Sequence, residues 1–254
     1  MLKLILIGTG NISRFLFDVL VDHPDVSIMQ VLGRNEQALD YFRDHTEVSS
    51  DFKEIASADV YVLAVSDQAI AEVSHNLPIE KGLLVHTAGS ISMDVLPGEM
   101  RRGVFYPLQT LSGILPEKIR DIPFCVEATR EEDYLLLEKL ALLISDRVER
   151  INSEQRKFLH LSAVFANNFS NHLFYLSSEV CEEHGVDFDL IRPLIRESCT
   201  KVMNQTPFEA QTGPARRGDQ RTLEEHLGML KSPRLKAIYE LLSESIQKTY
   251  GREL

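Results

Sequence analysis

The chain has 254 residues and a formal net charge of −11, with 27 lysines and arginines against 38 acidic residues. This acidic balance argues against nucleic acid or an anionic membrane as a partner. No apolar run has the length of a membrane span, and the N-terminus lacks the charged, apolar and small-residue regions of a signal peptide. We therefore expect a cytoplasmic protein with one large or two modest domains.

The three cysteines predict neither a disulfide framework nor a metal site. Cys125, Cys181 and Cys199 are odd in number and widely spaced. Disulfide frameworks use even numbers of cysteines, and zinc sites use closely spaced pairs. We expect reduced, mostly buried thiols.

The chain opens with an apolar strand that runs into a glycine turn. Residues 2–7 are almost continuously apolar, as in a buried parallel strand, and a Gly-x-Gly-x-x-Ser turn follows at residues 8–13. The first glycine of such a turn permits a tight bend, and the second lets the backbone approach a pyrophosphate. The helix expected over residues 12–21 would point N–H groups at the phosphates. The pattern predicts a dinucleotide site, and the alternative is an ordinary strand-to-helix turn.

The segment after the second expected strand, residues 26–32, indicates which dinucleotide binds. Gly33-Arg34-Asn35 stands where a protein that binds NAD places an acidic residue on the ribose hydroxyls. A guanidinium there can pair with a 2′-phosphate, which a carboxylate would repel. We interpret Arg34, helped by Asn35, as a selector for NADP (NADPH). The alternative is a solvated surface arginine.

Residues 1–151 alternate strand and helix. Further strands are expected at 60–65, 83–86, 104–106 and 124–126, and helices at 36–44, 68–76 and 131–144. This alternation predicts an α/β fold with a Rossmann, doubly wound, mostly parallel sheet. Ligands of such sheets lie beyond the carboxyl ends of the strands. The cofactor contacts expected at that edge are Gly8, Thr9, Gly10, Asn11, Ile12, Gly33, Arg34, Asn35, Val65, Ser66 and Asp67.

Residues 152–254 show helical patterns without a β pattern. Helices are expected at 156–178, 187–204, 223–230 and 233–250, with a kink or break at Pro193. We therefore predict a Rossmann NADP-binding domain over residues 1–151 and an all-helical substrate and dimerisation domain over residues 152–254. The apolar C-terminal helices favour a homodimer through the second domain.

The first of these helices carries a polar stripe. At 100° per residue, His160, Asn167 and Asn171 share one side of it. The opposite side holds Phe165, Phe169, Leu173 and Leu176. A helix that is apolar on most sides is expected to be buried, so the polar stripe needs partners. One interpretation is a substrate cleft with His160 as proton donor or acceptor, because histidine titrates near neutral pH. A buried polar network between packed helices or subunits is the alternative.

A second polar cluster, Thr-Gly-Pro-Ala-Arg-Arg-Gly-Asp, occupies residues 212–219. Its glycines and proline predict an irregular loop of fixed geometry, and such loops often carry function. The guanidinium of Arg217 can hold a substrate carboxylate in a bidentate pair. A hinge or dimer contact braced by arginine and aspartate is the alternative.

Five segments occur together and in order along the chain. They are the glycine turn, His86-Thr87-Ala88-Gly89-Ser90, Phe105-Tyr106-Pro107-Leu108-Gln109-Thr110, the helix with His160 and Asn167, and Thr212-Gly213-Pro214 through Arg217-Gly218-Asp219. The combination resembles a bacterial family of Rossmann-like proteins with a C-terminal domain of unknown function. That family is similar to pyrroline-5-carboxylate reductase, ketopantoate reductase, 6-phosphogluconate dehydrogenase and deazaflavin-dependent NADP oxidoreductases.

The resemblance covers essentially the whole chain and implies a nicotinamide-dependent oxidoreductase. It also implies a helical domain, like that of 6-phosphogluconate dehydrogenase, that completes the active site, often across a dimer. Ketopantoate reductases and 6-phosphogluconate dehydrogenases place a lysine on the long helix, with an asparagine or histidine a turn later. This chain has Lys157 a turn before His160. That departure leaves the proton donor open between the two, and we favour His160.

We therefore expect hydride transfer from NADPH to a small carbonyl or imine substrate, with a 2-oxo acid such as ketopantoate as the leading candidate. The cofactor supplies the difficult chemistry, and the protein orients the reactants. The expected catalytic residues are His160, Asn167 and Ser90, and the expected substrate-binding residues are Arg217, Asn171 and Gln109. No metal is expected. Two rival hypotheses are a non-catalytic NADP-binding sensor or scaffold and a Rossmann domain that binds another nucleotide or a flavin.

Overall fold

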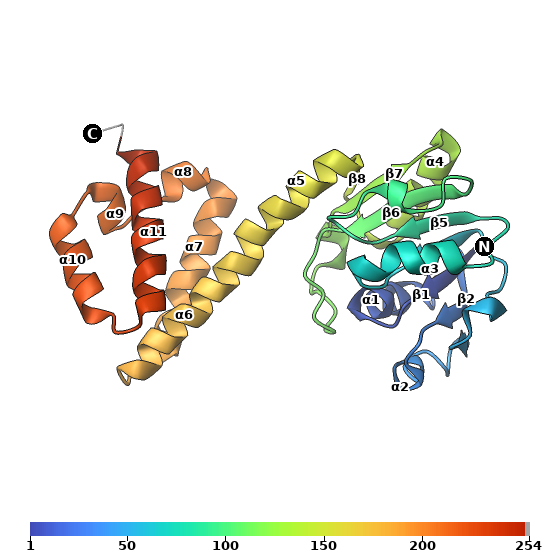
Figure 1. The fold of residues 1–254 in the computed structure, drawn as a ribbon, viewed down its shortest axis with the longest axis horizontal. Coiled ribbons are helices and arrows are strands. Elements are labelled where there is room, and N and C mark those ends of the chain that lie inside the picture. Colours follow the sequence, from blue (N-terminus) through green and yellow to red (C-terminus); the bar gives the residue numbers. More distant parts are fainter. Residues whose placement is uncertain (252–254) are drawn as a thin grey trace. The chain divides into compact units, whose positions relative to one another are not determined.

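The computed structural model describes residues 1–251, which form two compact units divided between Ala166 and Asn167. Each unit is described by itself (Figure 1). The boundary between the units lies inside a helical run, so the domain boundary predicted at residues 151 and 152 stays a prediction. None of the helices described is long and apolar enough to cross a membrane.

Within residues 1–251, the first unit contains an eight-stranded sheet in the order β3-β2-β1-β4-β5-β6-β7-β8. All neighbouring strands are parallel except β6 and β7, which are antiparallel. The strands are β1 (Leu2–Ile7), β2 (Val26–Leu32), β3 (Glu47–Ser49), β4 (Val60–Leu63), β5 (Leu83–His86), β6 (Arg101–Pro107), β7 (Phe124–Ala128) and β8 (Val148–Arg150). The predicted Rossmann-like, mostly parallel sheet is confirmed.

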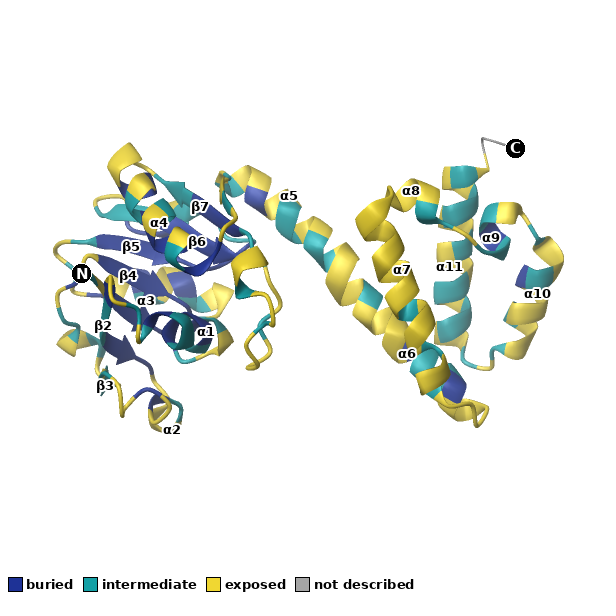
Figure 2. Cartoon of the chain, turned by 180° about the vertical axis from the view of Figure 1, so that it is seen from behind, coloured by how far each residue is buried: buried dark blue, intermediate teal, exposed yellow. Residues whose placement is uncertain are grey.

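Helices cover both faces of this sheet, as the doubly wound prediction requires. The helices of the first unit are α1 (Asn11–Leu20), α2 (Glu36–Leu39), α3 (Ile70–Asn76), α4 (Glu131–Ile144) and α5 (Ser153–Ala163). Side chains of α1 and α4 share one apolar core with one face of the strands, and α3 packs on the other face. The central strands β1, β4 and β5 are almost fully buried (Figure 2). Because helices cover both faces of the sheet, the sequences of these strands are almost continuously apolar.

The second unit is helical, as predicted. Its helices are α6 (Ser170–Glu183), α7 (Arg192–Asn204), α8 (Pro207–Ala210), α9 (Pro214–Arg217), α10 (Gln220–Met229) and α11 (Pro233–Tyr250). Pro193 lies in the first turn of α7, because the helix expected from residue 187 begins only at Arg192. The break expected at this proline is confirmed, and the proline is compatible with a helix start.

Two expectations about local structure are wrong. The helix expected over residues 36–44 ends at Leu39, and turns follow that place Phe42 in the core. The irregular loop expected over residues 212–219 contains the short helix α9 between Gly213 and Gly218, which have φ values of +105° and +66°. Two of the three thiols, those of Cys125 and Cys181, are buried, in agreement with the expectation of mostly buried thiols, and Cys199 is exposed.

The long helix expected over residues 156–178 is longer and less regular than predicted. A π-helical segment, Val164–Phe169, follows α5 and precedes α6. A π-helix makes i→i+5 hydrogen bonds and turns less per residue than an α-helix, so the 100° spacing does not hold through it. The apolar side expected to be buried is also largely open, because Leu173 is 39% exposed and only Leu176 of that set is buried.

Replacing a core leucine of α4 measures how much its packing stabilises the sheet. Leu137 is fully buried against the strands, whereas Leu135 on the same helix is 53% exposed. We expect Leu137→Ala to lower the free energy of unfolding by about 2–5 kcal/mol, because it leaves a cavity. Leu135→Ala, the matched control, should stay within about 0.5 kcal/mol. Equal effects of the two substitutions in urea titrations would contradict the assignment of the core.

Candidate active site

Loops from neighbouring parallel strands meet at one edge of the sheet in the first unit. β1, β2, β4 and β5 are parallel, so the segments that follow their carboxyl ends lie at the same edge (Figure 1). These segments are residues 8–10, 33–35, 65–67 and 87–90. The edge is the usual position of a ligand in an open α/β sheet.

The turn after β1 can be made only with glycine at its first position. Gly8 has a φ of +121°, and a Cβ atom there would overlap the carbonyl oxygen of Ala64 and lie 2.7 Å from its carbonyl carbon. A Cβ at Gly10, by contrast, would meet nothing within 4 Å. The first glycine therefore lets β1 turn across the end of β4, and the second leaves the start of α1 uncovered.

The N-terminus of α1 has the features of an anion site. Its first turn contains no acidic residue, and its N-cap, Gly10, provides no side-chain hydrogen bond. The first N–H groups of a helix have no partner within the helix and carry its positive dipole end. Together with the open space at Gly10, this arrangement fits a pyrophosphate.

A cavity of about 330 Å³ extends from this turn along the strand ends. Its lining is Gly8, Thr9, Gly10, Gly33, Arg34, Asn35, Phe52, Ala64, Val65, Ser66, Ala69 and Val73. An adjoining cavity of about 180 Å³ shares Arg34, Phe52, Ala69 and Val73 with it and is also lined by Glu72, Asn76 and Leu77. Eight of the eleven predicted cofactor residues thus line one continuous hollow.

The other three predicted cofactor residues have different surroundings. Asn11 donates its side-chain N–H to the Leu111 carbonyl at 2.8 Å, and Ile12 packs against the core. Asp67 accepts a 2.7 Å hydrogen bond from the Ser90 hydroxyl. Their roles toward a cofactor stay predictions.

Arg34 and Asn35 differ in how much of their side chains is engaged. Asn35 caps α2 by accepting a hydrogen bond from the Ala38 N–H at 3.2 Å, which uses its oxygen. The exposed guanidinium of Arg34 has no hydrogen bond or ion pair with any side chain in residues 1–251. Phe52, which lines both cavities beside Arg34, was not identified from the sequence, because the short β3 before it gave no pattern.

A second group of side chains lies at the ends of β5 and β6. The Tyr106 hydroxyl is 3.3 Å from Nδ1 of His160, and the two rings meet edge to face with centroids 6.3 Å apart. A Cβ at Gly89 would come within 2.7 Å of that Nδ1 and 2.8 Å of the tyrosine ring. The loop after β5 therefore packs its backbone directly against the pair.

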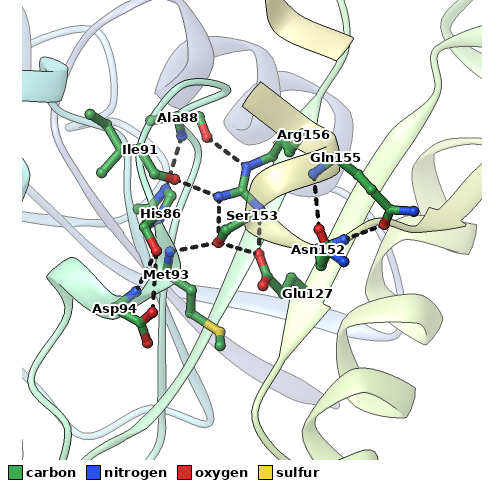
Figure 3. A network of polar contacts seen from close by, with 11 residues as sticks. His86, Ala88, Ile91, Met93, Asp94, Glu127, Asn152, Ser153, Gln155 and Arg156 are labelled. Carbon is green, nitrogen blue, oxygen red and sulfur yellow. Dashed lines mark hydrogen bonds and ion pairs between the residues drawn. The ribbon is translucent and has the colours of Figure 1, made fainter. Parts of the chain in front are cut away.

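Arg156, one turn before His160 on α5, anchors this loop (Figure 3). Its fully buried guanidinium donates to the carbonyls of Ala88 at 3.2 Å and Ile91 at 2.5 Å. The guanidinium also pairs with the Glu127 carboxylate at 2.5 Å. The Ser153 hydroxyl accepts a hydrogen bond from Arg156 and donates one to Glu127. The network links the loop after β5, β7 and the start of α5.

Two buried groups beside this network have shifted pKa values. Burial raises the pKa of the Cys125 thiol to about 11. Burial, with the positive charge of Arg156 as a second cause, lowers the pKa of His86 to about 4. His86 is therefore neutral at pH 7. Its Nδ1 accepts from the Ala88 N–H at 3.2 Å, and its buried Nε2 has no hydrogen-bond partner among the residues described.

The remaining predicted site residues fall in both units. Gln109 is exposed and accepts a hydrogen bond from the Thr110 N–H through its side-chain oxygen. Asn167, Asn171 and Arg217 belong to the second unit. There Arg217 is exposed, whereas Arg216 is held by the Gln211 and Glu209 carbonyls and stacks on Tyr250.

Besides Phe52, two residues of the site were missed from the sequence. Tyr106 stood in a segment used only for the resemblance, and Arg156 was read simply as part of a helix. Their partners are 54 and 68 residues away along the chain. The one available signal was spacing, because Arg156 is four residues before His160 and so shares its helix face. Within residues 1–251, no group of three or more metal-binding side chains is close enough to hold a metal.

Two family matches divide the chain. Residues 3–88 match the family described as NADP oxidoreductase, coenzyme F420-dependent, and residues 122–246 match a domain of unknown function, DUF2520. A Bacteroides fragilis protein provisionally assigned as an NADP oxidoreductase is 39% identical, with 97% of this chain and 98% of that chain covered and a TM-score of 0.88. The chain belongs to this NADP oxidoreductase family. The predicted resemblance is confirmed.

More distant structures share the fold of this oxidoreductase. A protein from Thermotoga maritima is 24% identical over 98% of this chain and 99% of that chain, with a TM-score of 0.75. A 1-pyrroline-5-carboxylate reductase from Streptococcus pyogenes is 13% identical over 98% of both chains, with a TM-score of 0.67. No curated protein matches the chain. The glycine turn, the open helix start and the cavity fit the dinucleotide that family membership implies.

The shifted His86 pKa makes the stability of the oxidoreductase depend on pH. The unfolded state binds a proton on this side chain near pH 6.5 and the folded state only near pH 4. The contribution of neutral His86 to the free energy of unfolding is therefore fully present above pH 6.5. It decreases by about 3 kcal/mol as the pH falls toward 4. We expect His86→Asn to lose correspondingly less between these pH values in urea titrations, and the exposed His75→Asn to behave as wild type. Equal losses in wild type and His86→Asn would contradict the assignment.

Proposed function

We propose that the protein is an NADPH-dependent oxidoreductase that reduces a small carbonyl or imine substrate. The observation that carries this proposal is the continuous hollow that runs from the Gly8 turn to the exposed guanidinium of Arg34. Backbone N–H groups at the start of α1 would hold the pyrophosphate. When bound, the cofactor supplies the hydride, and the chain's own residues bind, orient and protonate.

Arg34 would select NADPH over NADH. A guanidinium and a 2′-phosphate form charge-assisted hydrogen bonds, which NADH cannot make. Arg34 is suited to this role because its guanidinium has no partner within residues 1–251 and lines both parts of the hollow. Asn35 retains only its side-chain N–H groups for the ligand, because its oxygen caps α2.

At the reacting end, His160 would supply the proton that follows hydride transfer. It is half-buried and held beside Tyr106 and Gly89. Ser90 would contact the reacting group as an acceptor, because its one hydroxyl proton is already donated to Asp67. An accepting hydroxyl oxygen can bind the N–H of an imine or amine substrate, whereas it has no proton to donate to a carbonyl oxygen.

The remaining candidate residues would bind or orient the substrate. Arg217 is the candidate for a substrate carboxylate, because it is exposed while Arg216 is engaged by carbonyls and Tyr250. Asn167, Asn171 and Gln109 stay candidates for orienting the substrate. The alternative function, a non-catalytic NADP-binding sensor or scaffold, keeps the cofactor hollow but gives no NADPH oxidation with any carbonyl or imine.

Direct titration with NADPH and NADH, followed by fluorescence, tests the cofactor assignment. We expect wild type to prefer NADPH and Arg34→Ala to weaken NADPH binding by about 10–100-fold while leaving NADH unchanged, because charged hydrogen bonds are lost. Arg43→Ala is the matched control, since Arg43 pairs with Asp40 and Glu36 outside the hollow. Gly8→Ala should abolish binding of both.

Binding of neither nucleotide by wild type would contradict the proposed function. An NADPH preference that survives Arg34→Ala would contradict the role of Arg34 alone. Oxidation of NADPH in the presence of small 2-oxo acids or cyclic imines separates the enzyme from the scaffold.

We further propose a homodimer formed through the helical C-terminal domain. Large apolar side chains of this domain are exposed in the single chain, among them Leu190 at 71%, Leu194 at 62% and Leu241 at 67%. Soluble monomers seldom expose large groups of apolar side chains, and such groups usually mark an interface.

Light scattering on the purified protein tests the dimer. We expect a mass of twice the 28.8 kDa of one chain. Leu194→Glu in α7 should shift the protein toward the monomer mass, because burying the new carboxylate is costly. Lys118→Glu, an exposed change in the first unit, should leave the mass unchanged. A monomer mass for wild type would refute the proposal.

A further inference from the structure

Tyr106 belongs to the Tyr-Pro-Leu-Gln segment and has no role in the function proposed so far. Its ring is buried at the end of β6 in a small cluster with Val104 and Cys125. Its hydroxyl reaches His160, which is 54 residues later in the chain. A buried hydroxyl that meets a histidine at the ligand edge of the sheet calls for an explanation.

The direction of this hydrogen bond follows from the surroundings of the hydroxyl. Burial raises the pKa of Tyr106 to about 12, so the phenol keeps its proton at neutral pH. Among residues 1–251, His160 Nδ1 is the one hydrogen-bond partner of this hydroxyl. A buried hydroxyl donates to an acceptor where one is within reach. The direction that gives the buried phenol proton a partner is therefore donation from the Tyr106 O–H to Nδ1.

This direction determines where neutral His160 carries its own proton. The hydrogen bond at one ring nitrogen sets the protonation of the other. Because Nδ1 accepts, it is unprotonated, and the imidazole proton is on Nε2. Nε2 is then a donor, and the half-buried ring keeps access to a ligand.

The backbone of Gly89 keeps the two rings in this arrangement. Any side chain at this position would come within 3 Å of both Nδ1 and the tyrosine hydroxyl, at 2.7 Å and 2.9 Å. The loop cannot move away easily, because Arg156 holds the adjacent Ala88 carbonyl. The pair is therefore fixed from three elements: β6, the loop after β5, and α5.

We propose that Tyr106 is a positioning residue that fixes His160 with its proton on Nε2 and thereby makes this N–H the proton donor of the reaction. The inference rests on the proposed function. With NADPH supplying the hydride, the Nε2–H bond of His160 would break and an O–H or N–H bond would form on the substrate. The Tyr106 O–H bond would break as an Nδ1–H bond forms. Nδ1 would then return this proton to the Tyr106 oxygen while a solvent proton adds to Nε2, which restores the starting tautomer.

Nitrogen-15 NMR of histidine-labelled protein tests the tautomer without substrate. The signals of His160 are assigned by their loss in His160→Gln. We expect wild type at pH 8 to show Nδ1 unprotonated and Nε2 protonated. Tyr106→Phe should give a mixture of the two tautomers. Tyr134→Phe, which removes another buried tyrosine's hydroxyl that donates to Glu138, should leave the His160 signals unchanged.

NADPH oxidation supplies the functional readout, with pyruvate and 1-pyrroline as the first probes. We expect Tyr106→Phe to lower kcat by about 10–100-fold and to leave the NADPH dissociation constant within twofold of wild type. Gly89→Ala should perturb the tautomer and lower kcat in the same direction, because the added methyl separates the rings.

The two proposals fail in different ways. If Tyr106→Phe retains the wild-type tautomer of His160, the positioning role is overturned even when NADPH binds. If the tautomer shifts as expected but wild type binds no NADPH, the proposed function fails while the pairing of the two rings stands. A shifted tautomer with unchanged kcat on an accepted substrate also overturns the inference.

Discussion

The candidate active site depends on one buried cation. Arg156 has no exposed surface, yet its guanidinium is matched by the Glu127 carboxylate, two backbone carbonyls and the Ser153 hydroxyl. Burying a guanidinium without such partners would cost several kcal/mol. The fold therefore requires these four contacts. Because these partners come from the loop after β5, from β7 and from α5, satisfying the charge also fixes where those three elements meet (Figure 3).

The same sheet edge carries the cofactor hollow and the acid–base groups. The parallel strands β1, β4 and β5 are neighbours in the sheet. The glycine turn follows β1, the Ser66–Asp67 segment follows β4, and the loop with Gly89 and Ser90 follows β5. The hydrogen bond between Ser90 and Asp67 joins two of these loops directly. Glycine is used at this edge where backbone must pass close to something, which is Ala64 for Gly8 and the Tyr106–His160 pair for Gly89. The proposed dinucleotide site and the proposed proton donor would thus both depend on one topological feature, the shared carboxyl edge of the parallel strands.

The elements predicted well were those with a strong local signal. β2, β5, α4 and α11 have the bounds expected from apolar runs, a charged first turn or a proline start. The three-residue strands β3 and β8 were missed, because their pairing with a neighbour defines them and so short a run has no period. Contacts between distant segments were also out of reach. Eight of the predicted cofactor residues line the hollow, and they were predicted from local patterns at the ends of three strands. Tyr106 and Arg156, by contrast, contact partners more than 50 residues away.

Cys125 lies in the same small cluster as Tyr106, at the centre of the proposed chemistry. With a pKa of about 11, its thiol is deprotonated in only about one molecule in ten thousand at pH 7. Thiolates, not thiols, react with peroxides and alkylating reagents, and this sulfur is also 1% exposed. Cys125 therefore gives oxidants no reactive thiolate beside the proposed proton-transfer pair. Labelling reagents will instead find the exposed Cys199, far along the sequence on α7.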